Sequence, residues 1–262
     1  MVEARTVRLD SSSAVDDLGL IGLRDLAGMQ AGTGYRVVGG HMIRLLHGLY
    51  PTRTPARGTA DIDAAIPRGL EAVGESLHEG LTTGGYLPVQ GNRYERAHGR
   101  GTIVIELLTA STTGRIASTS IAGRQVDAVP GLELALATDP ILIRVDGRLR
   151  TGEEIEFEVP VPSVECALVL KAHAWRSRLS PKDVEDINTL LEIADDHRPA
   201  LEPWGLTNPA LADYSPYRRA RAHLTELAQR LRRGGMTGLP SHLHPPRMAA
   251  LIARHVSKPG RL

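Results

Sequence analysis

Several residue types are scarce in this chain of 262 residues, and each shortage excludes a class of protein. Cys166 is the only cysteine, which excludes an internal disulfide and any zinc site built on several cysteines. We expect Cys166 to serve as a small core residue. Aromatic residues make up only 3% of the chain, so leucine, valine, isoleucine and alanine must fill its core.

Long apolar runs are also missing. No run reaches the roughly twenty residues of a membrane span. Acidic residues such as Glu3, Asp10 and Asp16 interrupt the first apolar stretches, which is unlike the continuous apolar core of a signal peptide. With 42% hydrophobic and 23% charged residues, the chain can bury one large or two small cores. The sequence therefore predicts a globular protein of the cytoplasm that has no membrane partner.

Lysine is scarce as well, since only three of the 31 basic residues are lysines: Lys171, Lys182 and Lys258. A lysine ammonium is a compact point charge suited to a single phosphate oxygen, whereas an arginine presents a planar fork. Chance retention is a sufficient explanation for Lys258, which lies in an expected tail. Lys171 and Lys182 each occur within a short motif, and we interpret both as functional.

The basic residues are concentrated at the C-terminal end. From Arg218 onward the chain has ten lysines or arginines and one acid, Glu226, although its overall net charge is only +1. A basic end on an otherwise acidic chain favours contact with a polyanion such as RNA. The residues that we assign to this contact are Arg218, Arg219, Arg230, Arg232 and Arg233. A solvated amphipathic helix explains the pattern equally well, because apolar residues recur at helical spacing from Tyr217 to Leu231.

Hydrophobic periodicity predicts helices and strands in alternation over the first part of the chain. We expect helices over residues 16–29 and 41–50, and a third that begins near Pro67 and includes Leu81. The expected strands cover residues 35–38, 61–66, 102–108, 123–129, 141–145 and 155–159. Asp146-Gly147 has the sequence of a tight hairpin turn that leads towards the last of these strands.

After Pro160 the pattern changes to helices alone. The expected helices cover residues 163–178, 181–195, 217–232 and 246–256. Ser180-Pro181 is typical of a helix start and precedes the second of them. The predicted fold class is therefore α/β, of the α+β kind. A mixed-sheet lobe over residues 1–160 precedes a helical lobe over residues 161–262, whose C-terminal region is basic.

Two glycines and two aspartates form the strongest pattern in the first lobe. Gly39-Gly40 joins the strand 35–38 to the helix 41–50, and Asp61-Ile62-Asp63 follows on the next strand. Glycines at such a turn let backbone N–H groups approach a phosphate, and the helix N-terminus adds partial positive charge. Asp61 and Asp63 lie two residues apart on a strand, so their carboxylates share one face and can share one divalent ion. This order is the outline of a nucleotidyltransferase active site.

Phosphoryl transfer with two metal ions calls for a third carboxylate. Glu106 lies in the middle of the apolar strand 102–108, where a glutamate is costly unless it is paired or binds a metal. Asp127 is the alternative, although it lies close to the Pro130-Gly131 break and could simply end its strand. We favour Glu106 and retain Asp127.

Together these residues resemble the nucleotidyltransferase superfamily, and specifically the AbiEii/AbiGii type, which includes the toxins of bacterial type IV toxin–antitoxin systems. The resemblance extends from about Gly39 to Asp186 and is carried by four motifs. The motifs are Gly39-Gly40, Asp61-Ile62-Asp63, Leu170-Lys171-Ala172, and Arg178 with Lys182-Asp183-Val184-Glu185-Asp186. The last follows the family's pattern of a basic residue, Lys-Asp, two variable residues and a final Asp.

Two residues depart from the family's pattern. His41 stands where the wider superfamily has serine and this subgroup often has threonine, so a hydroxyl contact to the nucleotide phosphates is lost or replaced by an imidazole. Glu106 stands where aspartate is the commoner third acid. Its longer arm changes how close a general base lies to the attacking hydroxyl.

The resemblance implies a role for each residue. Asp61 and Asp63 would hold Mg²⁺ or Mn²⁺ against the triphosphate of an NTP. Glu106 would complete the metal site or take the proton from the acceptor hydroxyl. Lys171 would contact phosphate oxygens, and Asp186 would orient Lys171 or a substrate group. The residues expected to contact the nucleotide are Gly39, Gly40, His41, Lys171, Arg178 and Lys182.

With the basic C-terminal stretch, the resemblance implies a toxin that transfers a nucleoside monophosphate from an NTP to the 3′ end of tRNA. A cognate antitoxin protein would then be a partner. One alternative is transfer to a small hydroxyl compound such as an aminoglycoside, for which Asp195-Asp196 or Glu153-Glu154 could supply an acidic pocket. The other is a catalytically inactive module that binds nucleotide or RNA.

Overall fold

The computed structural model describes residues 3–29, 34–121 and 123–257, and Lys258 lies outside these ranges. The chain divides into two compact units. The first lobe comprises Met1–Leu49 and Arg57–Pro162, and the second lobe comprises Tyr50–Ala56 and Ser163–Leu262. The predicted fold class is confirmed, because strands and helices are mixed in the first lobe and the described elements of the second are helical. The division falls after Pro162, and the short segment 50–56 belongs to the second lobe.

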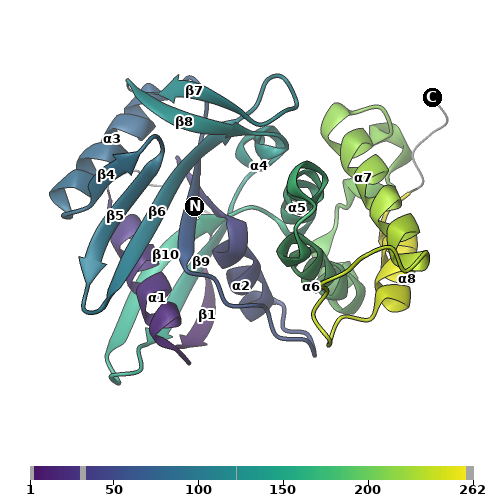
Figure 1. Cartoon of the computed structure of the whole chain (residues 1–262), viewed down its shortest axis with the longest axis horizontal. Coiled ribbons are helices and arrows are strands. Elements are labelled where there is room, and N and C mark those ends of the chain that lie inside the picture. The colour runs from purple at the N-terminus through teal and green to yellow at the C-terminus, as the bar shows by residue number, and fades with distance from the viewer. Residues whose placement is uncertain (1–2, 30–33, 122, 258–262) are drawn as a thin grey trace. The chain divides into compact units, whose positions relative to one another are not determined.

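A seven-stranded mixed sheet is the frame of the first lobe (Figure 1). Its strands are β2 (Arg36–Val38), β3 (Asp61–Ile66), β4 (Leu87–Gln90), β5 (Arg93–His98), β6 (Gly101–Ala110), β7 (Ala117–Ile121) and β8 (Arg124–Val129). The order is β2-β3-β6-β5-β4, while β8 pairs with β6 and with β7. β6 is the central strand, because it pairs in parallel with β3 and β8 and antiparallel with β5. The predicted strands include β2, β3, β6 and β8 but not β4, β5 or β7, which bury few of their residues.

A separate three-stranded sheet has the order β1-β9-β10. It consists of β1 (Arg5–Asp10), β9 (Ile141–Arg148) and β10 (Glu154–Val161). The predicted hairpin turn at Asp146-Gly147 is wrong, because both residues lie inside β9 and the turn falls at residues 149–153. Gly147 instead makes room for a neighbour, since a Cβ atom there would lie 2.8 Å from Cγ1 of Ile155.

Two helices of the first lobe lie against both of its sheets. α1 (Ala14–Ala27) contacts β3, β6 and β10, and α2 (Gly39–Leu49) contacts β1, β2, β3 and β10. Gly22 permits the close approach of α1, because a Cβ atom there would lie 2.6 Å from Cδ1 of Ile62. The other helices of this lobe are α3 (Glu71–Thr83) and α4 (Leu132–Ala137).

In the described part of the second lobe, four α-helices pack together. They are α5 (Val164–Arg178), α6 (Pro181–His197), α7 (Ser215–Arg232) and α8 (Pro245–His255), with short 3₁₀ turns η1 (Arg198–Leu201), η2 (Gly205–Thr207) and η3 (Pro209–Leu211). α6 and α7 each contact both α5 and α8. The buried Arg221 of α7 donates hydrogen bonds to four backbone carbonyl oxygens of the segment 205–211. This arginine therefore has a structural role.

The buried residues agree with the composition. Leucine, isoleucine, valine and alanine form most of the core, and Cys166 is buried in α5. Among the described residues, no helix is both long and apolar enough to cross a membrane.

Candidate active site

The two predicted metal-binding aspartates lie on the face of β3 that points away from α1. Ile62 and Ala64 are fully buried, and the Ile62 side chain contacts α1 at Gly22. Asp61 is exposed and Asp63 is half-buried, so the two acids share the opposite face of the strand. Their spacing of two residues had predicted this arrangement.

Strand pairing puts Glu106 beside Asp63. β3 and β6 run parallel, and Asp63 and Glu106 are register partners. Neighbouring strands are about 4.8 Å apart, and register partners share a face, so these two carboxylates are adjacent. Asp127 pairs with Leu108 instead, farther along β6 and on the edge of β6 that is opposite to β3. Glu106 therefore lies directly beside Asp63, whereas Asp127 does not.

The turn before α2 lies directly against Asp63. Gly39 has a φ angle of 68°, in the left-handed region, and a Cβ atom there would lie 1.8 Å from Oδ2 of Asp63. Gly40 is also crowded, because its Cβ atom would lie 2.7 Å from Oγ1 of Thr59. Both the backbone conformation and the carboxylate therefore require glycine at position 39. The positive end of the α2 dipole begins beside the acids of β3.

Arg93 of β5, which is not among the residues predicted for the site, contacts Glu106. Its Nη1 atom donates to Oε1 of Glu106 at 3.0 Å, and its Nε atom donates to Oε1 of Glu95 at 2.7 Å. Arg93 is also the register partner of Glu106, so Asp63, Glu106 and Arg93 form a row across three strands. The alternation of Arg93 and Glu95 around the buried Tyr94 is the sequence signal that could have found it.

The acids suit a divalent ion in their chemistry. Carboxylate oxygens are the ligands that Mg²⁺ prefers. Within the described ranges, however, no three His, Cys, Asp or Glu side chains converge closely enough to hold a metal ion. Glu106 is engaged by Arg93 instead. If Glu106 completes a metal site with Asp61 and Asp63, it must exchange Arg93 for the ion.

His41 lies inside the first lobe. Its side chain packs against α1, where a Cβ atom on Gly19 would lie 2.4 Å from Cε1 of the ring. Neither ring nitrogen has a hydrogen-bond partner among the described residues. Burial, together with the nearby charge of Arg44, lowers the pKa of His41 to about 3, although Asp16 acts in the opposite sense. The predicted contact of His41 with nucleotide phosphates is not supported by this buried, neutral placement.

Four charged residues of the family-like motifs gather on α5 and α6 of the second lobe. Nζ of Lys171 is 2.6 Å from Oδ2 of Asp186 and 3.9 Å from Oδ1 of Asp183. Arg178 donates to both carboxylate oxygens of Asp183, at 2.6 Å each. Lys171 is only 4% exposed, and both aspartates are completely buried. We call these four residues the charge cluster.

The charge cluster matches part of what the resemblance implied. The contact by which Asp186 would orient Lys171 is present. The Lys171 ammonium is buried, however, so it reaches a phosphate only if the cluster opens. Arg178 and Lys182 are exposed at the end of α5 and the start of α6.

Four of the five arginines assigned to RNA contact are exposed: Arg218, Arg219, Arg232 and Arg233. Arg230 is ion-paired with Glu226 at 2.7 Å, and its guanidinium lies over the ring of Trp175. Helix geometry separates Arg218 from Arg232 by about 21 Å on one side of α7. The exposed charges therefore form two groups, one at each end of the helix.

Comparison with known proteins adds no relative, since neither a protein-family model nor a curated protein matches the chain.

Replacing His41 tests its burial. We expect His41→Leu to keep or raise the free energy of unfolding near neutral pH, because it removes two unpaired nitrogens from the core. The folded pKa of His41 lies below its unfolded value, so its contribution to stability is complete above about pH 6.5 and falls with acidification towards about pH 3. Between neutral pH and about pH 4.5, the free energy of unfolding should therefore fall by roughly 2–3 kcal/mol less in the variant than in the wild type. Urea unfolding measures both values, and equal pH dependence in the two proteins would contradict the buried neutral imidazole.

A double-mutant cycle tests the charge cluster. Lys171→Met should lower the free energy of unfolding by about 3–5 kcal/mol, because it leaves the buried Asp186 carboxylate without its cation. Adding Asp186→Asn should recover most of this loss. Denaturant unfolding of the four proteins measures the coupling. Losses that simply add would mean that the two residues do not form the pair described.

Proposed function

We propose that the protein is a metal-dependent nucleotidyltransferase that moves a nucleoside monophosphate from an NTP to an acceptor hydroxyl. The observation that carries the proposal is the adjacency of Asp63 and Glu106 on parallel strands, with Gly39 against Asp63 at the start of α2. Carboxylates for a divalent ion and a glycine turn for phosphates thus occur side by side.

Each residue of the first lobe has a proposed task. Asp61 and Asp63 would hold Mg²⁺ or Mn²⁺, which supplies positive charge to the triphosphate and to the departing pyrophosphate. The backbone N–H groups of Gly39 and Gly40 donate to phosphate oxygens. The acceptor oxygen bonds to the α-phosphorus, the bond from that phosphorus to pyrophosphate breaks, and Glu106 accepts the hydroxyl proton.

The family resemblance also implies a phosphate contact for Lys171, and Asp186 is the positioning residue that holds its ammonium at 2.6 Å. Arg178 and Lys182 are exposed and suited to further contacts with a polyanion. Because Lys171 is buried, opening of the charge cluster is part of the proposal.

We infer that the acceptor is RNA, with the 3′ end of tRNA as the leading candidate. The exposed arginines at the two ends of α7 support a polyanionic acceptor. The tRNA end, the role as a toxin and a cognate antitoxin follow from the family resemblance.

An aminoglycoside acceptor has less support, because basic residues lie near each of the acidic pairs proposed for it. Asp195 pairs with Arg254 and with His255. Asp196 lines a cavity together with Arg53 and Arg247. Glu153 and Glu154 also have arginines close by.

Transfer of labelled nucleotide tests the proposed activity. Incubation with each labelled NTP, Mg²⁺ and total tRNA should label the RNA. Asp61→Asn and Asp63→Asn should each reduce labelling at least about 100-fold while the fold persists, because a carboxamide keeps the shape but loses the charge. Glu106→Gln should also reduce labelling, whereas Asp127→Asn is the matched control that should not. Unchanged labelling by folded Asp63→Asn would refute the proposed metal site. Label found on aminoglycosides and not on RNA would show that the acceptor is a small molecule.

Replacing the exposed arginines of α7 tests the RNA acceptor. Changing Arg218, Arg219, Arg232 and Arg233 to glutamine should weaken RNA binding. The slope of log affinity against log salt should flatten by roughly 3, because about four fewer phosphate contacts release counterions. Filter binding over a series of salt concentrations measures both effects.

The matched control removes the same charge from the three-stranded sheet of the first lobe and from the turn between β9 and β10. It changes the exposed Arg5, Arg8, Arg148 and Arg150 to glutamine. If both variants bind RNA with the wild-type affinity and salt slope, α7 is only a solvated amphipathic helix.

A further inference from the structure

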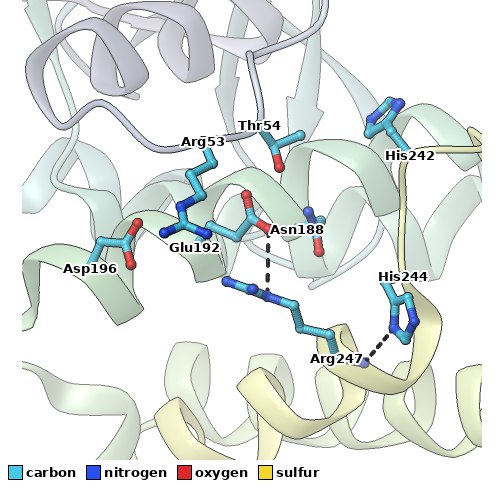
Figure 2. Close-up of a pocket in the computed structure, with 8 residues that line it drawn as sticks. All are labelled: Arg53, Thr54, Asn188, Glu192, Asp196, His242, His244 and Arg247. Atoms are coloured by element: carbon cyan, nitrogen blue, oxygen red, sulfur yellow. Dashed lines mark hydrogen bonds and ion pairs between the residues drawn. The ribbon is translucent and has the colours of Figure 1, made fainter.

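A polar cavity of about 570 Å³ lies within the second lobe (Figure 2). Its lining consists of Arg53 and Thr54 from the segment 50–56, Asn188, Glu192 and Asp196 from α6, and His242, His244 and Arg247 from the start of α8 and the segment before it. The volume lies within the roughly 300–1,000 Å³ of ligand pockets. None of these residues has a task in the proposed transfer reaction.

One wall of the cavity is a face of α6. Asn188, Glu192 and Asp196 are spaced by four residues, which puts them on one side of the helix. Asn188 is 6% exposed and Glu192 is 8% exposed. This wall therefore presents an amide and a carboxylate that are both almost entirely withdrawn from water.

Glu192 is only partly satisfied by the chain. Its Oε1 atom is 3.8 Å from Nε of Arg247. Its Oε2 atom is buried and has no hydrogen-bond partner in the described part of the chain. A buried acceptor without a donor costs about 1–3 kcal/mol. A ligand with an N–H donor would remove this cost once a turn of the carboxylate presents Oε2 to the cavity.

Cationic and planar side chains surround this wall. Figure 2 shows the side chains of Arg53 and Arg247 on two sides of Glu192. Guanidinium groups bind phosphate in a bidentate manner, and guanidinium and imidazole planes both stack on nucleobases. His244 is held in place, because its Nδ1 atom accepts from the backbone N–H of Arg247 at 3.4 Å.

We propose that this cavity binds a nucleoside monophosphate. The base lies against Asn188 and Glu192, and its exocyclic amino group donates to Oε2 of Glu192. The phosphate lies against the guanidinium groups of Arg53 and Arg247, on the sides that face away from the Glu192 carboxylate. A free amino acid also combines a donor with an anion, but it has no planar body for the imidazole and guanidinium surfaces and leaves most of the cavity unfilled.

Binding to the full chain tests this proposal. Isothermal titration calorimetry with AMP, CMP, GMP and UMP is carried out with EDTA and without NTP, so the result does not depend on the transfer reaction. The three nucleotides with an amino group should bind saturably. UMP, adenosine and inorganic phosphate should each bind about tenfold more weakly than AMP or worse, because each lacks at least one recognised group.

Variants locate the bound nucleotide. Glu192→Met should weaken AMP binding about tenfold and keep or raise the melting temperature, because it removes a buried unpaired acceptor. The double variant Arg53→Gln with Arg247→Gln should weaken binding of AMP by a similar factor but leave that of adenosine unchanged. Arg150→Gln, an exposed arginine of the first lobe, is the control that should keep the wild-type affinity.

Three results would overturn the proposal. Absence of saturable binding at millimolar nucleotide would leave a cavity that holds only water. Equal affinity for AMP and inorganic phosphate would mean that the cavity binds an anion without recognising the base. Wild-type affinity in both the Glu192→Met and the double arginine variants would put the nucleotide elsewhere.

Discussion

Parallel pairing of β3 with β6 is the constraint on which the candidate active site depends. It sets Asp63 directly beside Glu106, and the antiparallel partner β5 then adds Arg93 to the same row. The second fixed point is Gly39, whose missing side chain leaves space for the Asp63 carboxylate. Since α2 begins at Gly39 and lies against both sheets, the core of the first lobe holds the helix N-terminus next to the acids. A change of register by one residue would turn Glu106 to the other face and separate it from Asp63.

Most of the buried charged side chains described in the second lobe have an ion-pair or hydrogen-bond partner within the chain. Lys171 is held by Asp186, and the Glu165 carboxylate accepts hydrogen bonds from the Leu206 backbone N–H and the Tyr217 hydroxyl. Removing one member of such a set costs more than the set contributes, so these pairs fix one arrangement of the helices. The buried Oε2 atom of Glu192 differs, because the chain supplies it with no donor among the described residues. That contrast is the physical reason for assigning a ligand to its cavity.

Spacing along one element could be predicted from the sequence, whereas contacts between elements could not. Asp61 and Asp63 share a face because they lie two residues apart on a strand, and the helices of the second lobe were predicted to within two residues at each end because their apolar stripes are long. β5 buries only Tyr94 and so offers little apolar pattern, and the strand and the partner of Glu106 were both missed. His41 follows a glycine pair that predicts a phosphate-binding turn. Its ring instead packs in the core, because Gly19 of α1 has no side chain to fill that space. Asp146-Gly147 matched a turn sequence, yet pairing on both sides of β9 keeps it extended.

The proposed metal site can be observed in a crystal structure of the full chain with Mn²⁺ and a non-hydrolysable NTP analogue. We expect an anomalous signal from Mn²⁺ bound by Asp61 and Asp63, with Glu106 released from Arg93 and the triphosphate at the backbone of Gly39 and Gly40. Mn²⁺ bound away from β3, or a triphosphate bound elsewhere while the Arg93–Glu106 ion pair stays intact, would contradict it.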